Sequence, residues 1–344
     1  LGKIVCGGNT VEVTGRTDIG PASGSADQAT LQCDASAMFL GSGRTGSFAL
    51  VVNQGGTFTG GSGNHTIGSI DVKNNSNAKC TLTSGVTTLD GESASDNYNL
   101  FVAANGTFAH GSGTVTVTFN GISFFEKTSG TLTLNNLIIN HASADISTNS
   151  NLTCAGDVTL TAGKLNGRDD AISFGSLTIA SGGTYQATSG TTTITSFNSS
   201  NDIFRTESGG TFTHNNGTVK VTTNNSGKYF RPTNVTFYNV QISNNDAGAY
   251  VRWRGTPCTI SNDLTIDANS KFKPHSETQV LNVTGEVILS GTNSFLDGND
   301  PNNDASTQDW SFGSLTINSG ATYRATSGTT IMKGALRNVG GTIS

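Results

Sequence analysis

The sequence predicts an all-β fold, a single-stranded parallel β-helix (β-solenoid) with about 25 to 28 residues per coil. Three observations predict this fold. The segment from Phe174 to Ile194 returns almost unchanged from Phe312 to Met332. In five places an aromatic residue precedes a Gly by five positions. Gly, Thr, Ser and Asn are abundant, and this mixture is poor for helices, whereas Thr, Val, Ile and Phe favour strands.

The repeated segment defines the unit: a strand, a Gly turn, an aromatic residue, a Gly-Thr pair and a second strand. Tyr185 and Phe212 occupy equivalent positions in successive units, one period apart. Cys80, five positions before Gly85, stands where an aromatic residue is expected. One such unit cannot bury its own apolar face, so we expect about twelve or thirteen units stacked like upon like. The aromatic positions of the repeat are Phe58, Phe108, Tyr185, Phe212, Phe272 and Tyr323.

In chain order, residues 1–46 are the least regular, and we expect an irregular N-terminal cap or degenerate coils there. Residues 47–344 are expected to form a continuous solenoid, truncated at one or both ends. The alternation from Val115 to Phe119 predicts a strand with one buried face, and the apolar run from Leu137 to Ile139 predicts deep core. Asn-Gly and Ser-Gly pairs between the strands indicate sharp corners.

Composition excludes several classes of function. The net charge is −5 and charged residues make up 12%, so no broad basic surface exists for nucleic acid or anionic lipid. No apolar run approaches the roughly 18 residues of a membrane span. We therefore expect neither nucleic-acid binding nor membrane insertion. The cysteines lack zinc spacing, and no phosphate-binding loop or Ser/His/Asp signature occurs, so no cofactor is expected.

The spacing of Cys6 and Cys33 equals the spacing of Tyr185 and Phe212, one period of the repeat. It would place the two cysteines on neighbouring coils about 4.8 Å apart, a separation that a disulfide tolerates. The alternative is a pair of buried, reduced thiols that act as small apolar groups.

The unit from Leu177 to Thr192, repeated from Leu315 to Thr330, resembles units of right-handed β-helical surface and virion proteins. These include phage tail-fibre or virion-appendage proteins and filamentous-haemagglutinin-like bacterial adhesins. The phage resemblance implies a non-catalytic, extracellular structural or adhesive rod, which presents a polar face to host-surface glycans or partner subunits. The bacterial resemblance implies a cell-surface adhesin or filament subunit. Because open solenoid ends expose strand edges, we also expect a homo-oligomer or filament.

Two sets of acidic residues are candidates for chemistry. A resemblance to pectate lyases and tailspike glycosidases implies a polysaccharide lyase or glycosidase as the alternative function, with Asp169, Asp170 and Glu207 as the catalytic candidates. Asp is also a common turn former, which is the competing interpretation. Asp297, Asp300 and Asp304 form an oxygen-rich segment that resembles a calcium loop but fails the EF-hand pattern, and a solvent loop is the favoured interpretation.

The segment from Tyr250 to Arg254 is the candidate for binding. Arg252 and Arg254 alternate with Val251 and Trp253, so one face would bury the Trp and the other would display guanidinium groups. The alternative places Trp253 outward, where it would form a platform with Tyr250, Arg252 and Arg254 for sugars or another protein.

Overall fold

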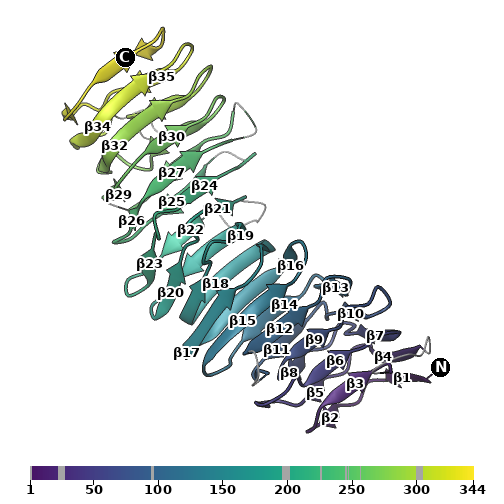
Figure 1. Ribbon diagram of the computed structural model, residues 1–344. Helices are drawn as coiled ribbons and strands as arrows, with labels where there is room; N and C mark the ends of the chain where they lie inside the picture. Colours follow the sequence, from purple (N-terminus) through teal and green to yellow (C-terminus); the bar gives the residue numbers. More distant parts are fainter. Residues whose placement is uncertain are drawn as a thin grey trace. The chain divides into compact units, whose positions relative to one another are not determined.

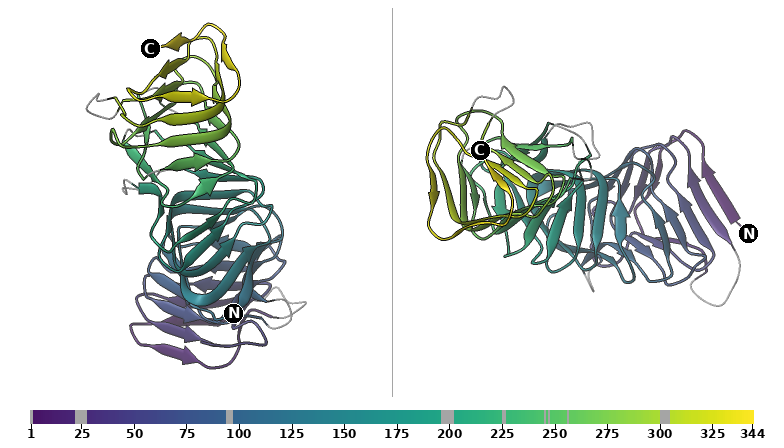
Figure 2. Two further views of the ribbon diagram at one scale, coloured as in Figure 1. Left: turned by 90° about the vertical axis from the view of Figure 1, so that its left-hand side faces the viewer. Right: turned by 90° about the horizontal axis from the view of Figure 1, so that it is seen from above.

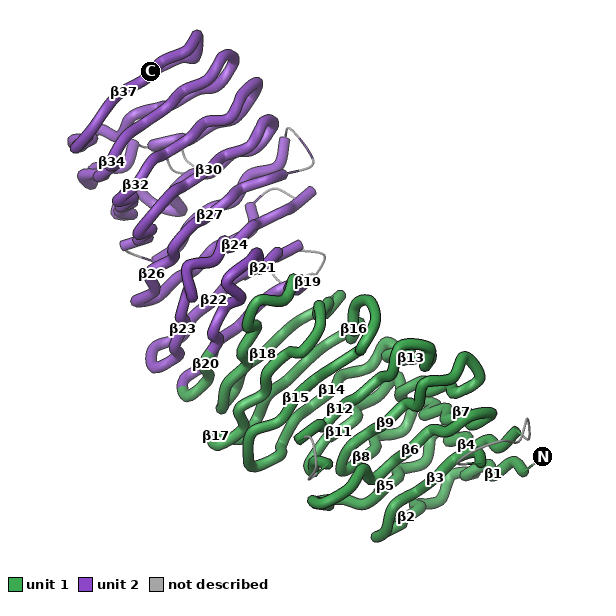
Figure 3. The backbone as a smooth tube through the Cα atoms, in the orientation of Figure 1, with its two compact units in different colours: residues 1–171, 182–184 green, residues 172–181, 185–344 purple. Residues whose placement is uncertain are grey.

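The computed structural model describes residues 2–21, 28–93, 97–195, 202–224, 227–244, 246, 248–255, 257–299 and 305–344. In these residues it contains β-strands and no helix (Figure 1). The chain divides into two compact units: unit 1, residues 1–171 with 182–184, and unit 2, residues 172–181 with 185–344 (Figure 3).

The strands of unit 1 are β1 (Gly2–Cys6), β2 (Val11–Val13), β3 (Thr17–Ile19), β4 (Ala29–Cys33), β5 (Met38–Leu40), β6 (Leu50–Val52), β7 (Gly56–Thr59), β8 (His65–Ile67), β9 (Ile70–Val72), β10 (Lys79–Thr81), β11 (Val86–Leu89), β12 (Tyr98–Val102), β13 (Thr107–Ala109), β14 (Thr114–Val117), β15 (Ile122–Lys127), β16 (Leu132–Leu134), β17 (Asn136–Thr148) and β18 (Leu152–Asn166). Residues of β20 (Gly183–Gln186) belong to both units.

The strands of unit 2 are β19 (Ile172–Ile179), β21 (Thr191–Ile194), β22 (Asp202–Thr206), β23 (Thr211–Thr213), β24 (Thr218–Val221), β25 (Lys228–Arg231), β26 (Thr236–Phe237), β27 (Asn239–Ile242), β28 (Val251–Trp253), β29 (Cys258–Ile260), β30 (Leu264–Ile266), β31 (Lys271–Pro274), β32 (Leu281–Leu289), β33 (Phe295–Asp297), β34 (Trp310–Ile317), β35 (Thr322–Arg324), β36 (Thr330–Met332), β37 (Leu336–Asn338) and β38 (Thr342–Ile343).

Parallel pairing of successive coils confirms the predicted fold class. In unit 1, β1, β4, β7, β10 and β13 follow one another in a single parallel sheet. In unit 2, β21, β24, β27 and β30 do the same. Figure 2 shows the strands of each unit stacked as successive coils. The fold is an all-β parallel β-solenoid of about 14 turns.

The length of the coil differs from the prediction. Gly2 pairs with Ala29, a separation within the predicted range, but Leu132 pairs with Leu152 across a much shorter coil and Thr17 with Leu50 across a longer one. The predicted 25 to 28 residues per coil are therefore corrected to about 23 on average, with no constant period. Only the strands must stack, so the corners between them accept insertions and deletions. Strands β1 to β5, which lie in the segment expected to be a cap or degenerate coils, each pair in parallel with a strand of the next coil.

The interior of unit 1 consists of columns of inward side chains. Cys80 pairs with Phe58 on one neighbouring coil and with Phe108 on the other, in the place where the repeat has an aromatic residue. Leu137 and Ile139 are completely buried, whereas Ile138 between them is half-buried, so alternation in the strand limits the predicted deep core to two of the three residues. Each column is continuous because parallel register places inward residues over inward residues.

The interior of unit 2 is rich in stacked rings. The ring centroids of Tyr185 and Phe212 are 6.0 Å apart, so the two residues share one core. The Tyr185 hydroxyl lies 2.8 Å from Thr192 Oγ1, and the second copy of the repeat makes the same contact between Tyr323 and Thr330 at 2.6 Å. A shared hydrogen bond explains why the aromatic residue and the Thr occur together in both copies.

Glycine allows neighbouring corners to approach closely. Gly85 and Gly113 follow Cys80 and Phe108 by five positions, at the same corner of adjacent coils. A Cβ atom on Gly113 would clash with the backbone carbonyl oxygens of Thr83 and Gly85. At position 113 the space between coils therefore requires a Gly.

Unit 1 also buries one carboxylate beside a cation. Asp71 in β9 is only 1% exposed, and its Oδ2 lies 2.5 Å from Lys73 Nζ. Its other oxygen, Oδ1, has no hydrogen-bond partner in the described residues. Burial raises the pKa of Asp71. The charges of Lys73 and Arg16 lower this pKa, whereas the charge of Asp18 raises it further. The ionised carboxylate is therefore held at a cost in free energy.

We expect Gly113→Ala to destabilise the fold by about 1 to 3 kcal/mol, because the added methyl group forces adjacent coils apart. Chemical unfolding followed by circular dichroism measures the loss. Gly15→Ala is the matched control, since a Cβ atom there meets nothing within 4 Å. Equal stability of the two variants would contradict the close approach of the corners.

Asp71→Asn should stabilise the protein at neutral pH. The pKa of Asp71 in the folded state is raised above the ordinary value of 3.8. The protein is therefore most stable with respect to this group at low pH, where Asp71 is protonated. This stability is lost as the pH rises through the folded-state pKa and Asp71 ionises. Removing the charge should raise the melting midpoint at pH 7 by about 2 to 4 °C and leave it almost unchanged near pH 3. Glu12→Gln is the control, since this exposed carboxylate is not among the charges that shift the pKa of Asp71. A lower midpoint for Asp71→Asn at pH 7 would show that the Lys73 ion pair outweighs the burial cost.

Candidate functional site

Three adjacent strands of unit 2 bring tyrosines and cations to one outer face. Tyr229 in β25 pairs with Arg252 in β28, which pairs with Lys273 in β31. Tyr250 and Arg254 flank β28. Within β28, Val251 and Trp253 are fully buried, so the residue between them points outward. We call Tyr229, Tyr250, Arg252, Arg254 and Lys273 the tyrosine–arginine patch.

The cations of the patch lie over the tyrosine rings. Arg252 Cζ is 4.8 Å from the centroid of Tyr250 and 5.9 Å from that of Tyr229. Arg254 Cζ lies 5.7 Å from the Tyr229 ring, and Lys273 Nζ lies 5.0 Å from the Tyr250 ring. Arg252 also donates a short hydrogen bond from Nη2 to the Tyr250 hydroxyl. Rings that hold several cations at once reduce the freedom of these long side chains before any ligand arrives.

The patch carries three positive charges. In the part of the chain that the structure describes, no ion pair joins Arg252, Arg254 or Lys273 to a carboxylate. The neighbouring Arg231, in contrast, lies 3.2 Å from the carboxylate of Asp202. Such a cationic surface is unusual in a chain of net charge −5, and it suits an anionic ligand.

Trp253 does not belong to this surface. Its ring is completely buried, with ring centroids 4.6 Å from Phe272 and 5.2 Å from Trp310. The alternative that placed Trp253 outward in the binding site is therefore corrected, and the alternation of β28 puts it in the core. Tyr250, Arg252 and Arg254 do lie together, and the structure adds Tyr229 and Lys273 to them.

The sequence did not indicate Tyr229 and Lys273, because only the register between strands brings them beside Arg252. Each is an outward residue of a strand that alternates with buried residues, Phe230 and Phe272. Their separations from Arg252 are both shorter than the predicted period, and the two separations differ from each other. A constant period therefore does not align them with Arg252.

The catalytic candidates lie in separate surroundings. Glu207, in unit 2, forms an ion pair of 2.9 Å with Arg205. Asp170, in unit 1, has a pKa raised first by burial and further by the charges of Asp169 and Glu126, while a hydrogen bond with Thr148 opposes the shift. Glu126 lies on another coil, and its charge contributes to the raised pKa of Asp170. The sequence did not indicate Glu126 as a neighbour of Asp170.

The calcium candidates are only partly described. Asp300 and Asp304 lie outside the described residues. Asp297 has an 8% exposed side chain, lies 3.2 Å from Arg324 Nη1 and accepts a hydrogen bond from the backbone N–H of Asn299. Among the described residues, no group of three or more His, Cys, Asp and Glu side chains is arranged to hold a metal ion.

The five cysteines are buried and free in the structure. Cys6 and Cys33 pair in register on β1 and β4, as their spacing predicts, but no bridge joins them. Burial, with a contribution from Cys6, raises the pKa of Cys33 to about 12, so its thiol is protonated at neutral pH. The disulfide stays a prediction.

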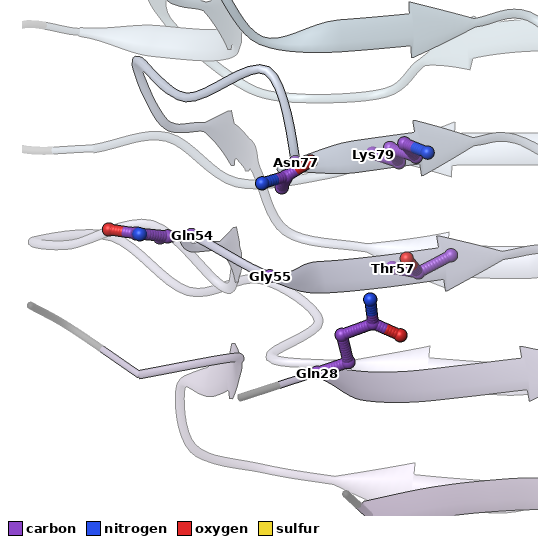
Figure 4. A pocket seen from close by; sticks show the side chains of 6 residues that line it. All are labelled: Gln28, Gln54, Gly55, Thr57, Asn77 and Lys79. Carbon is purple, nitrogen blue, oxygen red and sulfur yellow. The ribbon is translucent and has the colours of Figure 1, made fainter. Parts of the chain in front are cut away.

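A polar notch in unit 1 has a volume of about 100 Å³ (Figure 4). It lies at the corners that precede β4, β7 and β10, and its lining is Gln28, Gln54, Gly55, Thr57, Asn77 and Lys79. Small-molecule sites are usually about 300 to 1,000 Å³. The notch is therefore too small to enclose an organic ligand.

Comparisons with known proteins give little further guidance. No protein-family model matches the chain, and no curated protein matches it. Among solved structures, the TibC-catalysed hyper-glycosylated fragment 55–350 of TibA is similar over 97% of this chain and 96% of that chain, with 12% identity and a TM-score of 0.26. The likeness to TibA assigns neither a family nor a function to the chain.

No helix in the described residues has the length and apolar character needed to cross a membrane.

Proposed function

We propose that this β-solenoid is a non-catalytic, extracellular, adhesin-like protein of a cell surface, and that its tyrosine–arginine patch binds acidic surface polysaccharides. The observation that carries the proposal is the set of three cations, Arg252, Arg254 and Lys273, that lie over tyrosine rings without carboxylate partners in the described chain.

The chemistry of the patch fits sugar carboxylates or sulfates. A guanidinium group forms paired hydrogen bonds with such planar or tetrahedral anions, and an ammonium group adds a point charge. The tyrosine rings offer apolar faces to the sugar and hold the cations in place. Arg252 Nε is buried without a hydrogen-bond partner in the described residues, so the guanidinium group is not fully satisfied within the chain.

The shape of the site fits a polymer that binds on an open face. The patch extends over three adjacent coils, at about 4.8 Å per coil. Contacts of this kind are individually weak, and repetition along a polymer raises their combined strength. The expected homo-oligomer or filament would multiply the patches in the same way and stays a proposal.

Neutralising Arg252 and Lys273 together, as Arg252→Gln with Lys273→Gln, should weaken binding to acidic polysaccharides about ten- to hundredfold, because two charge-assisted contacts are lost. Isothermal titration with polygalacturonate and with a sulfated polysaccharide, at two salt concentrations, measures the change. The dependence of affinity on salt should also decrease, since fewer charges take part.

The matched control is Arg337→Gln, an exposed guanidinium group on β37, in a different column of unit 2. Wild-type affinity in the double variant, or an equal loss in the control, would contradict the patch as the site. Release of reducing sugar from the same polymers, abolished by Asp170→Asn, would instead support the lyase or glycosidase alternative.

A further inference from the structure

An outer face of unit 1 carries a group of aromatic rings that the core does not use. Phe48, Tyr98, Phe101 and Phe124 are all half-buried. The ring centroids of Tyr98 and Phe101 are 4.9 Å apart, those of Tyr98 and Phe124 6.0 Å, and those of Phe48 and Phe101 6.5 Å. We call these four residues the aromatic platform. Rings that are tilted against one another and partly exposed offer flat apolar surface at low entropic cost.

A row of hydrogen-bonding side chains continues from the platform over the next coils. Phe101 pairs with Glu126 on β15, and the Tyr98 hydroxyl donates to Glu126 Oε2 at 2.6 Å. Asn149 Nδ2 donates to the same oxygen at 3.2 Å, and Arg168 donates a short hydrogen bond to Asn149 Oδ1. Asp170 lies within the electrostatic influence of Glu126 and Arg168. Contacts between coils thus prearrange Glu126, Asn149 and Arg168. We call these three residues, together with Asp170, the polar row.

From this geometry we infer that the aromatic platform and the polar row form a binding site for a neutral, unbranched polysaccharide. The apolar faces of sugar rings would pack on Phe101, Tyr98 and Phe124. Sugar hydroxyls would exchange hydrogen bonds with the amide, carboxylate and guanidinium groups of the polar row. Tyr98 and Asn149 both donate to Oε2 of Glu126. No residue in the described part of the chain donates to Oε1, so this oxygen can accept a hydrogen bond from a sugar hydroxyl.

The charge of the surface selects a neutral ligand over an acidic one. Glu126, Asp169 and Asp170 contribute carboxyl groups, and Arg168 is the guanidinium group that opposes them. The carboxylates of Asp169 and Glu126 act electrostatically on Asp170, and Arg168 is the cation that opposes them, so a further anion would be repelled. This site therefore has the opposite preference to the tyrosine–arginine patch of unit 2, and the inference does not rest on the proposed function of that patch.

Binding of neutral polymers tests the inference. The probes are unbranched glucans, mannans, galactans and xylans, titrated into the full chain by calorimetry, with polygalacturonate as the acidic comparator. Phe101→Ala should weaken binding of the neutral polymer at least tenfold, whereas Phe101→Tyr should stay within about twofold of the wild type. Asn149→Ala alters the polar row without touching a ring and should weaken binding about three- to tenfold. Phe39→Ala, which removes a 38% exposed ring on another face of unit 1, is the control and should change nothing.

Three results would overturn the inference. One is that none of the neutral polymers binds the wild-type chain at millimolar concentration. Another is unchanged affinity in both Phe101→Ala and Asn149→Ala, with folding verified by circular dichroism. The third is acidic polymer bound at the polar row, seen as a loss of polygalacturonate affinity in Asn149→Ala. Arg252→Gln with Lys273→Gln should leave binding of the neutral polymer intact, which separates this test from that of the patch.

Discussion

Parallel backbone ladders between successive coils are the constraint on which both units depend. Each strand pairs with the coils before and after it, so an inward side chain has inward neighbours in its own column. The column of Phe58, Cys80 and Phe108 shows what the constraint demands. A thiol replaces a ring there because a buried, protonated Cys behaves as a small apolar group. The column must be apolar and continuous, whereas the identity of each member is less restricted.

The inward columns could be predicted from the sequence because they repeat. The aromatic-to-Gly spacing identified the shared core of Tyr185 and Phe212 and the odd position of Cys80 without any knowledge of coil length. Coil length itself could not be predicted as one number. The separation between the paired residues Leu132 and Leu152 is far shorter than that between Thr17 and Leu50, since corners meet water and can vary.

The candidate sites were harder to predict because the length of the coil varies. They lie on outward columns, which no repeat marks, and their members come together only through register. Arg252 and Arg254 were visible in one strand, but Tyr229 and Lys273 reach them across coils of unequal length. Glu126 similarly accepts a hydrogen bond from Asn149 of another coil, and its charge acts on Asp170. Trp253 was ambiguous in the sequence, and burial of its large apolar ring beside Phe272 decides its orientation.

The outward columns then determine what kind of ligand suits the fold. The tyrosine–arginine patch of unit 2 is cationic. In unit 1 an aromatic platform lies beside a polar row that carries carboxylates, and both sites lie on open faces of their units. A ligand on an open face is only partly dehydrated at each contact, so each contact contributes little and the contributions must be added over several coils. A polymer with a repeating chemical unit meets this requirement, because successive positions of an outward column are about 4.8 Å apart. A single small molecule reaches only one or two positions of a column. The geometry that makes the core repetitive is therefore compatible with the polymeric ligands that we propose for both faces.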